Sequence, residues 1–155
     1  MKVLIATDGS DASRRIIETA CGLITNPENT AVKIISAVEP YAPMGAEPFA
    51  VSAAYYAELE GAGRGQAKIS VEQAATNLKE LCPRLSDVSS KVLRGTSAAQ
   101  AIVETAREWS ADLIIVGSHG YGFWSRALLG SVSNSVVHHA PCSVLIVRQK
   151  NNAKS

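Results

Sequence analysis

The 155-residue chain is poor in cysteine, in surplus charge and in long apolar runs. Its three cysteines, Cys21, Cys82 and Cys142, are odd in number and form no CxxC pair, which favours free thiols in a reducing compartment. Lys and Arg number 15 against 14 Asp and Glu, so no charge surplus favours a nucleic acid or an anionic membrane. No run approaches the roughly 18 apolar residues of a membrane-spanning helix, and the segment before Thr7 is too short for a signal peptide. We therefore expect a cytoplasmic protein without membrane or nucleic-acid contacts.

Strand-like and helix-like segments alternate along the sequence. Apolar runs predict strands at residues 3–6, 32–38, 88–94, 113–116 and 144–147. Helical spacing of apolar residues predicts helices after residue 10, over 69–81, over 101–109 and after 131. This alternation indicates one α/β domain over residues 1–148, with a parallel sheet covered by helices on both faces, and a polar tail over 149–155.

The region from residue 39 to 85 is the least regular part of the chain. Pro40, Pro43 and Pro48 predict a loop at its start, because proline cannot donate a backbone hydrogen bond. Residues 50–59 suit a helical turn or two, and the glycines of residues 61–65 are expected to interrupt the helix as a flexible loop. Lys68 does not complete a P-loop, so these glycines do not predict a phosphate site.

Two loops carry the chemistry that suggests a ligand. Residues 7–10, Thr-Asp-Gly-Ser, follow the first strand, and residues 117–120, Gly-Ser-His-Gly, follow the fourth. Gly130 and Ser131 then precede a helix, whose free N–H groups and partial positive charge favour an anion such as phosphate. In parallel sheets, ligands bind at the carboxyl ends of the strands where the strand order reverses. The sequence therefore predicts a phosphate-containing ligand between these two loops.

The spacing G-x2-G-x9-G-[ST], formed by Gly117, Gly120, Gly130 and Ser131, resembles the nucleotide motif of the universal stress protein family. Residues 3–10 and 140–147 resemble the beginning and end of the family's domain. The resemblance implies a Rossmann-like domain with strand order 3-2-1-4-5 and four helices. It also implies an ATP-binding stress or signalling module, and a homodimer paired through the fifth strand, residues 144–147.

The resemblance also implies roles for individual residues. Asp8 matches a contact to adenosine, and the other matching positions surround the base, the ribose and the phosphates: Ala6, Thr7, Ala37, Val116, Gly117, Gly120, Gly130, Ser131, Val132 and Ser133. Mg²⁺, with Mn²⁺ as the alternative, would accompany ATP, held mainly by phosphate oxygens and water, with the Ser131 and Ser133 hydroxyls as the nearest protein ligands.

Several of these residues have a second interpretation. Asp8 could simply cap the first helix, and Ser131 could be an N-cap whether or not it contacts phosphate. His119 adjoins Ser118, but no Gly-x-Ser-x-Gly elbow is present to make the pair catalytic. Arg126 could reach a phosphate or lie in solvent. Without a P-loop lysine or an evident base, nucleotide binding is better supported than catalysis, and a slow ATPase or another nucleotide-dependent enzyme is the alternative.

Overall fold

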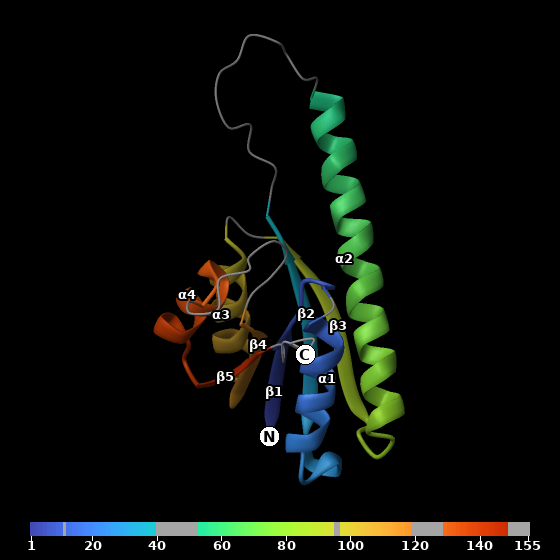
Figure 1. Cartoon of the computed structure of the whole chain (residues 1–155), viewed down its shortest axis with the longest axis vertical. Coiled ribbons are helices and arrows are strands. Elements are labelled where there is room, and N and C mark those ends of the chain that lie inside the picture. Colours follow the sequence, from blue (N-terminus) through green and yellow to red (C-terminus); the bar gives the residue numbers. More distant parts are fainter. Residues whose placement is uncertain (11, 40–52, 95–96, 119–128, 149–155) are drawn as a thin grey trace, which may run out of the picture.

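Strands and helices alternate in the structure as the sequence predicts. The computed structural model describes residues 1–10, 12–39, 53–94, 97–118 and 129–148. Its elements, shown in Figure 1, are β1 (Lys2–Ala6), α1 (Ala12–Leu23), the short 3₁₀ helix η1 (Pro27–Asn29), β2 (Ala31–Val38), α2 (Ala53–Leu81), β3 (Asp87–Arg94), α3 (Ala98–Trp109), β4 (Leu113–Gly117), α4 (Ser131–His139) and β5 (Ser143–Val147).

The five strands form one parallel sheet in the order β3-β2-β1-β4-β5, which confirms the predicted order 3-2-1-4-5. The central strands β1 and β4 read as continuous apolar runs because both of their faces are covered. Ala6 of β1 pairs with Ile35 of β2 on one side and with Val116 of β4 on the other. The loops that follow β1 and β4 therefore emerge next to each other at the carboxyl end of the sheet.

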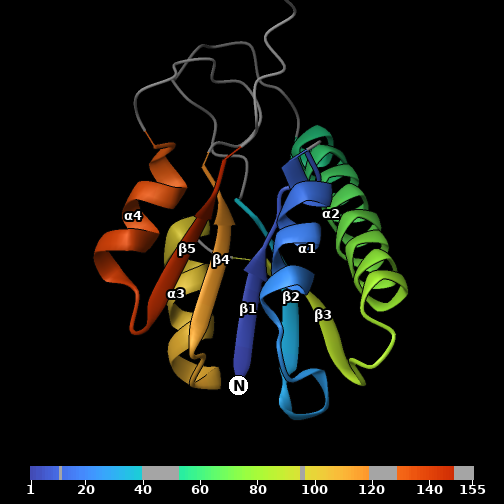
Figure 2. The same ribbon diagram turned by 60° about the horizontal axis from the view of Figure 1, so that its bottom comes forward.

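Helices cover both faces of the sheet, as predicted (Figure 2). On one face, α1 and α2 pack over a core that includes Ile17, Ile34 and Leu78, all nearly inaccessible to solvent. On the other face, α3 and α4 enclose a second core that includes Ile35 and Val136. Two apolar layers therefore fix the positions of the helix ends that surround the carboxyl edge of the sheet.

Helix α2 differs from the prediction. It runs without interruption from Ala53 to Leu81, so the expected loop at residues 61–65 is wrong. A Cβ atom added at Gly61 or Gly65 would meet nothing within 4 Å, which places these glycines on an open helix face where they leave the hydrogen-bond ladder intact. Figure 1 shows the start of α2 extending past the sheet. Despite the length of α2, no helix in the described ranges is long and apolar enough to span a membrane.

The cysteines also differ from the prediction. Cys21, in the last turn of α1, and Cys82, directly after α2, form a disulfide with their Cα atoms 6.0 Å apart. The expectation of three free thiols is therefore wrong, and Cys142 is the free cysteine of the structure. Sequence spacing could not reveal the pair, because the packing of α1 beside α2 brings together residues 61 positions apart. A cytoplasmic location stays a prediction.

Candidate functional site

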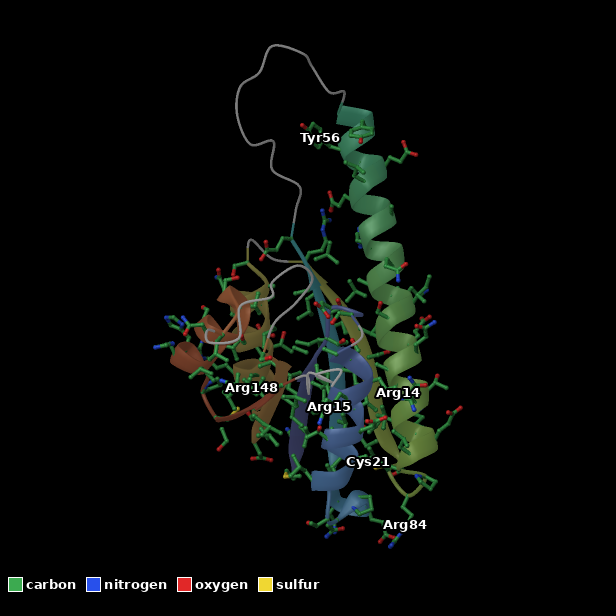
Figure 3. The ribbon with its side chains drawn as sticks, in the orientation of Figure 1. Arg14, Arg15, Cys21, Tyr56, Arg84 and Arg148 are labelled. Atoms are coloured by element: carbon green, nitrogen blue, oxygen red, sulfur yellow. A yellow bond between two sulfur atoms is a disulfide. The ribbon has the colours of Figure 1, made fainter. Side chains whose placement is uncertain are left out.

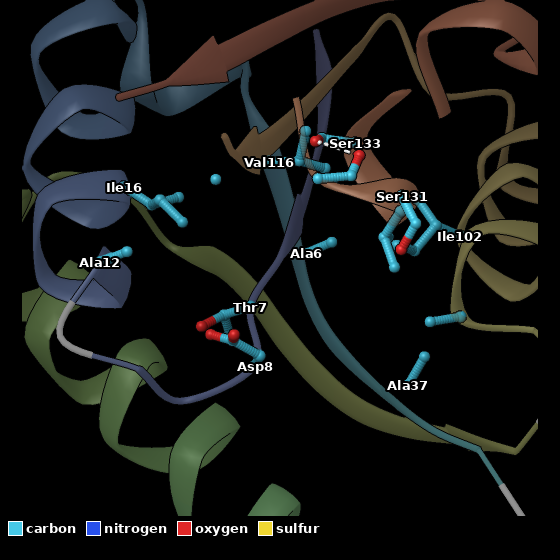
Figure 4. Close-up of a pocket in the computed structure, with 14 residues that line it drawn as sticks. Ala6, Thr7, Asp8, Ala12, Ile16, Ala37, Ile102, Val116, Ser131 and Ser133 are labelled. Atoms are coloured by element: carbon cyan, nitrogen blue, oxygen red, sulfur yellow. Dashed lines mark hydrogen bonds between the residues drawn. The ribbon is translucent and has the colours of Figure 1, made fainter. Parts of the chain in front are cut away.

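A pocket lies at the carboxyl ends of β1, β2 and β4, between the first turns of three helices (Figure 4). Its volume is about 300 Å³, near the lower end of the roughly 300–1,000 Å³ typical of ligand sites. The residues that line it are Ala6, Thr7, Asp8, Ala12, Ile16, Ala37, Ala98, Ile102, Val116, Gly117, Gly130, Ser131, Val132 and Ser133.

Ten of the eleven residues predicted for the nucleotide line this pocket. The eleventh, Gly120, lies outside the described residues, as do His119 and Arg126. Four lining residues were missed: Ala12, Ile16, Ala98 and Ile102. The sequence marks Ile16 and Ile102 only as members of helical apolar stripes, because a helix end that faces a cavity has the same periodicity as one that faces the core.

Small side chains create the cavity. Ala6, Ala37, Ala12 and Ala98 come from two strands and two helices and converge on one space (Figure 4). A longer aliphatic side chain at any of them would occupy part of this volume. Ile16, Ile102 and Val116 add apolar surface around these alanines, which suits the faces of a flat heterocycle better than a strongly charged group.

The loop after β1 is held by its own side chains. The buried hydroxyl of Thr7 shares a hydrogen bond with the Ser13 hydroxyl of α1 and accepts one from Gly9 N–H at 3.2 Å. The Asp8 carboxylate accepts a hydrogen bond from Ser10 N–H at 2.9 Å, which is an Asx turn within the loop before α1 and not a cap of that helix. Asp8 itself is exposed and lines the pocket, which leaves its carboxylate accessible to a ligand.

The N-terminus of α4 forms the polar wall of the pocket. Gly130 is its N-cap and makes no side-chain cap bond, while its N–H donates to the carbonyl of Ser118 at 2.8 Å. The Ser133 hydroxyl is buried, 3.0 Å from the carbonyl oxygens of both Ser118 and Gly130. The N–H groups of Ser131, Val132 and Ser133 occupy the first helical turn, which has no partners within the helix. The Ser131 side chain is exposed.

The N-terminus of α3 at the same rim is already capped. Its Ala98 N–H donates to the Glu39 carboxylate at 2.8 Å, and Ser97 Oγ accepts from Gln100 N–H at 3.5 Å. An anion at this rim would therefore meet a negative charge beside α3 and, at α4, N–H groups that have no partner among the described residues. The two helix ends divide the rim into an end suited to a neutral group and an end suited to a phosphate.

The pocket offers binding groups but few groups for catalysis. Asp8 is the single ionisable side chain among the described lining residues. His138 and His139 are exposed at the far end of α4, with their Nδ1 atoms 2.8 Å from the carbonyl oxygens of Asn134 and Ser135. Within the described ranges, no cluster of three His, Cys, Asp or Glu side chains could hold a metal ion. The arrangement suits recognition of a ligand with an apolar part and an anionic part.

Comparison with known proteins agrees with this fold. Residues 1–148 match the model of the universal stress protein family. Universal stress protein A homolog 2 of Coxiella burnetii is 34% identical over 97% of both chains. A universal stress protein solved in complex with cAMP is 27% identical, with a TM-score of 0.65 over 96% of both chains. UspA from Lactobacillus plantarum shares the fold, with 23% identity and a TM-score of 0.79 over 96% of this chain and 97% of that one. The chain belongs to the universal stress protein family.

Proposed function

We propose that the pocket at the carboxyl end of the sheet binds an adenine nucleotide, ATP with Mg²⁺, and that the protein acts as a nucleotide-dependent stress or signalling module. The observation that carries the proposal is the uncapped N-terminus of α4 beside an apolar cavity. The helix N-terminus favours a phosphate, and the apolar cavity favours a base. The complex of a 27% identical universal stress protein with cAMP supports the same ligand class.

The nucleotide would lie across the pocket from α3 to α4. Its base would occupy the space left by Ala6, Ala37 and Ala98, and its ribose would approach Asp8 and Gly117. Its phosphates would reach the first turn of α4, where three backbone N–H groups lack helical partners. Gly130 would not supply a donor to the phosphates, because its N–H is already bonded to the carbonyl of Ser118.

The chain offers limited ligands for a divalent cation. Mg²⁺ prefers oxygen ligands and keeps several waters, so it would be held mainly by the phosphates and solvent. The exposed Ser131 hydroxyl is the better protein ligand of the two predicted serines, because the Ser133 hydroxyl is buried against two backbone carbonyls. When bound, the ion would neutralise phosphate charge that no described basic side chain of the pocket wall offsets.

The proposal is tested by calorimetric titration with ATP and Mg²⁺ of the wild type, Gly130→Val and Gly22→Val. Gly130→Val places a branched side chain in the pocket wall and should abolish detectable ATP binding while the circular dichroism spectrum stays unchanged. Gly22→Val is the matched control, because Gly22 lies near the end of α1, away from the pocket lining, and an added Cβ meets nothing within 4 Å. Equal ATP affinity in the wild type and Gly130→Val would contradict the proposal.

The same titrations separate binding from hydrolysis and test the ion. Repeating them with EDTA should weaken ATP binding, and unchanged affinity would show that the cation has no role. With saturating Mg-ATP, the wild type should release phosphate no faster than the Gly130→Val protein does. Sustained release well above that level would instead favour the alternative of a slow ATPase.

We propose also that two copies pair through β5. This strand is at one end of the sheet order, with β4 as its neighbour, and Val144, Leu145 and Ile146 are only half-buried. An apolar edge strand with free backbone donors and acceptors favours pairing with another strand. Antiparallel pairing about a two-fold axis would satisfy both edges with one self-complementary surface.

A further inference from the structure

The disulfide between Cys21 and Cys82 has no part in the nucleotide pocket. It joins the last turn of α1 to the residue after α2, whereas Ala12 and Ile16, in the first half of α1, line the pocket. Cys21 therefore lies nine residues beyond Ala12, roughly 13 Å along the helix axis at 1.5 Å per residue. We propose that this pair is a reversible redox modification site, oxidised by low-molecular-weight disulfides and reduced by thiols while the domain stays folded.

The bond is within reach of a small thiol. Cys21 and Cys82 are both partly exposed, and the residues that flank Cys82, Leu81 and Pro83, are exposed. Cys82 begins a surface turn in which its carbonyl accepts from Leu85 N–H at 2.9 Å. Figure 3 shows Cys21 at the end of the molecule that also carries Arg84. Thiol–disulfide exchange depends on access to the sulfur atoms, and the partial exposure of both cysteines favours that access.

The packing of α1 against α2 does not depend on the bond. Ile17 and Ala20 of α1 are buried in the same apolar cluster as Val71, Ala74 and Leu78 of α2. A domain of this size buries enough apolar surface to fold without a covalent link. Reduction would therefore leave the two helices packed, which makes the bond reversible in the native state.

The fold also determines which cysteines pair. Cys21 and Cys82 pack against the core beneath α1 and α2, whereas Cys142 packs against the core beneath α3 and α4, on the opposite face of the sheet. Burial, with a further contribution from Asp112, raises the pKa of the Cys142 thiol and so lowers its thiolate fraction. Cys142 therefore takes no part in the exchange, and oxidation yields one intramolecular product, the Cys21–Cys82 disulfide.

The exchange is balanced in atoms and electrons. In oxidation, one cysteine thiolate attacks a small disulfide RSSR, forms a mixed disulfide and releases RS⁻, which takes up the proton as RSH. The second thiolate attacks the protein sulfur of the mixed disulfide, forms the Cys21–Cys82 bond and releases the second RSH. Two protein thiols lose two electrons and two protons, and RSSR gains them. Reduction is the reverse sequence.

The test uses Cys142→Ser protein, in which Cys21 and Cys82 are the only cysteines that can be alkylated or oxidised. The protein is equilibrated without denaturant in glutathione buffers that range from fully reduced to fully oxidised. The exchange is then quenched, free thiols are alkylated, and the mass of the protein is measured by mass spectrometry. We expect two alkylated thiols in the reduced buffer and none in the oxidised buffer, with circular dichroism spectra of folded protein in both. The oxidised form should also unfold at a higher urea concentration.

Two controls and two contrary results complete the experiment. Cys21→Ser and Cys82→Ser, each combined with Cys142→Ser, should give at most one glutathione adduct and no internal bond. If Cys142→Ser folds poorly, the wild type takes its place in the experiment. It should then show three alkylated thiols when reduced and one when oxidised. Two alkylated thiols that persist in the oxidised buffer would overturn the proposal. A bond that yields to reduced glutathione only after urea is added would overturn it equally.

Discussion

Replacing Gly9 by alanine tests how the loop after β1 is built. Gly9 has φ +79°, in the left-handed region, and a Cβ atom added there would overlap Ser70 Oγ and lie 2.9 Å from Ser70 Cβ. An L-residue in that region costs about 1–2 kcal/mol. Moving Ser70 Oγ aside would also break its 2.9 Å hydrogen bond to the Gln66 carbonyl, worth roughly 0.5–1.5 kcal/mol.

Together these terms give a loss of about 2–4 kcal/mol, since the close approach to Ser70 Cβ also requires a small backbone shift. At about 2.1 cal/mol/K per residue, unfolding of 155 residues has an entropy of about 0.33 kcal/mol/K. The melting temperature of Gly9→Ala should therefore fall by roughly 6–12 °C. ATP affinity should fall as well, because Gly9 directly follows the pocket residues Thr7 and Asp8.

The assay is urea unfolding of the wild type, Gly9→Ala, Ser70→Ala and the double variant. Ser70→Ala removes the nearer of the two clashing atoms, so Gly9→Ala should cost about 1 kcal/mol less in that background. The backbone penalty should remain in both backgrounds. A Gly9→Ala protein as stable as the wild type would refute the account, and a coupling energy of zero would refute its steric part.

Further substitutions test other parts of the structure. Gly65→Ala should stabilise the domain by about 1 kcal/mol, because the added Cβ meets open space and alanine favours a helix; a lower urea midpoint would contradict this. Leu145→Pro should remove a ladder donor from β5 and give monomers or aggregates, whereas a monomeric wild type in light scattering at micromolar concentration would argue against the dimer. Burial, with Lys91 and Lys2 nearby, lowers the pKa of Lys33, so the unfolded state binds more protons between that lowered pKa and 10.5. The stability of the wild type relative to Lys33→Gln should therefore rise with pH through this window, and urea midpoints that differ equally at pH 7 and pH 10 would contradict it.

Much of the fold could be predicted because its central strands are buried on both faces. Such strands appear in the sequence as continuous apolar runs, as in residues 113–116, and the helices beside them show apolar stripes. Strand order required the family resemblance, since periodicity does not determine which strands are neighbours. The pocket residues on strands and glycine loops were predictable because motif spacing marks them. The pocket residues on helices, such as Ile102, could not be predicted, because isoleucine in a helical apolar stripe equally indicates a residue packed in the core.

The errors share one cause, which is tertiary packing that overrides local sequence. Glycines weaken an isolated helix, yet the second half of α2 is anchored by Val71, Ala74 and Leu78, and the helix continues through Gly61 and Gly65. The disulfide has the same origin. Its two cysteines become neighbours only when α1 and α2 lie together on one face of the sheet, a contact that no local pattern encodes.

The carbonyl oxygen of Ser118 has a consequence for protein engineering. It accepts hydrogen bonds from both the Gly130 N–H and the Ser133 hydroxyl, so the chain leaves the sheet and enters α4 at one fixed point. A dye attached to a cysteine that replaces the exposed Ser131 would thus lie at the rim of the pocket while the start of α4 keeps its place. The domain therefore offers a fixed attachment point at which ligand binding could be converted into a signal.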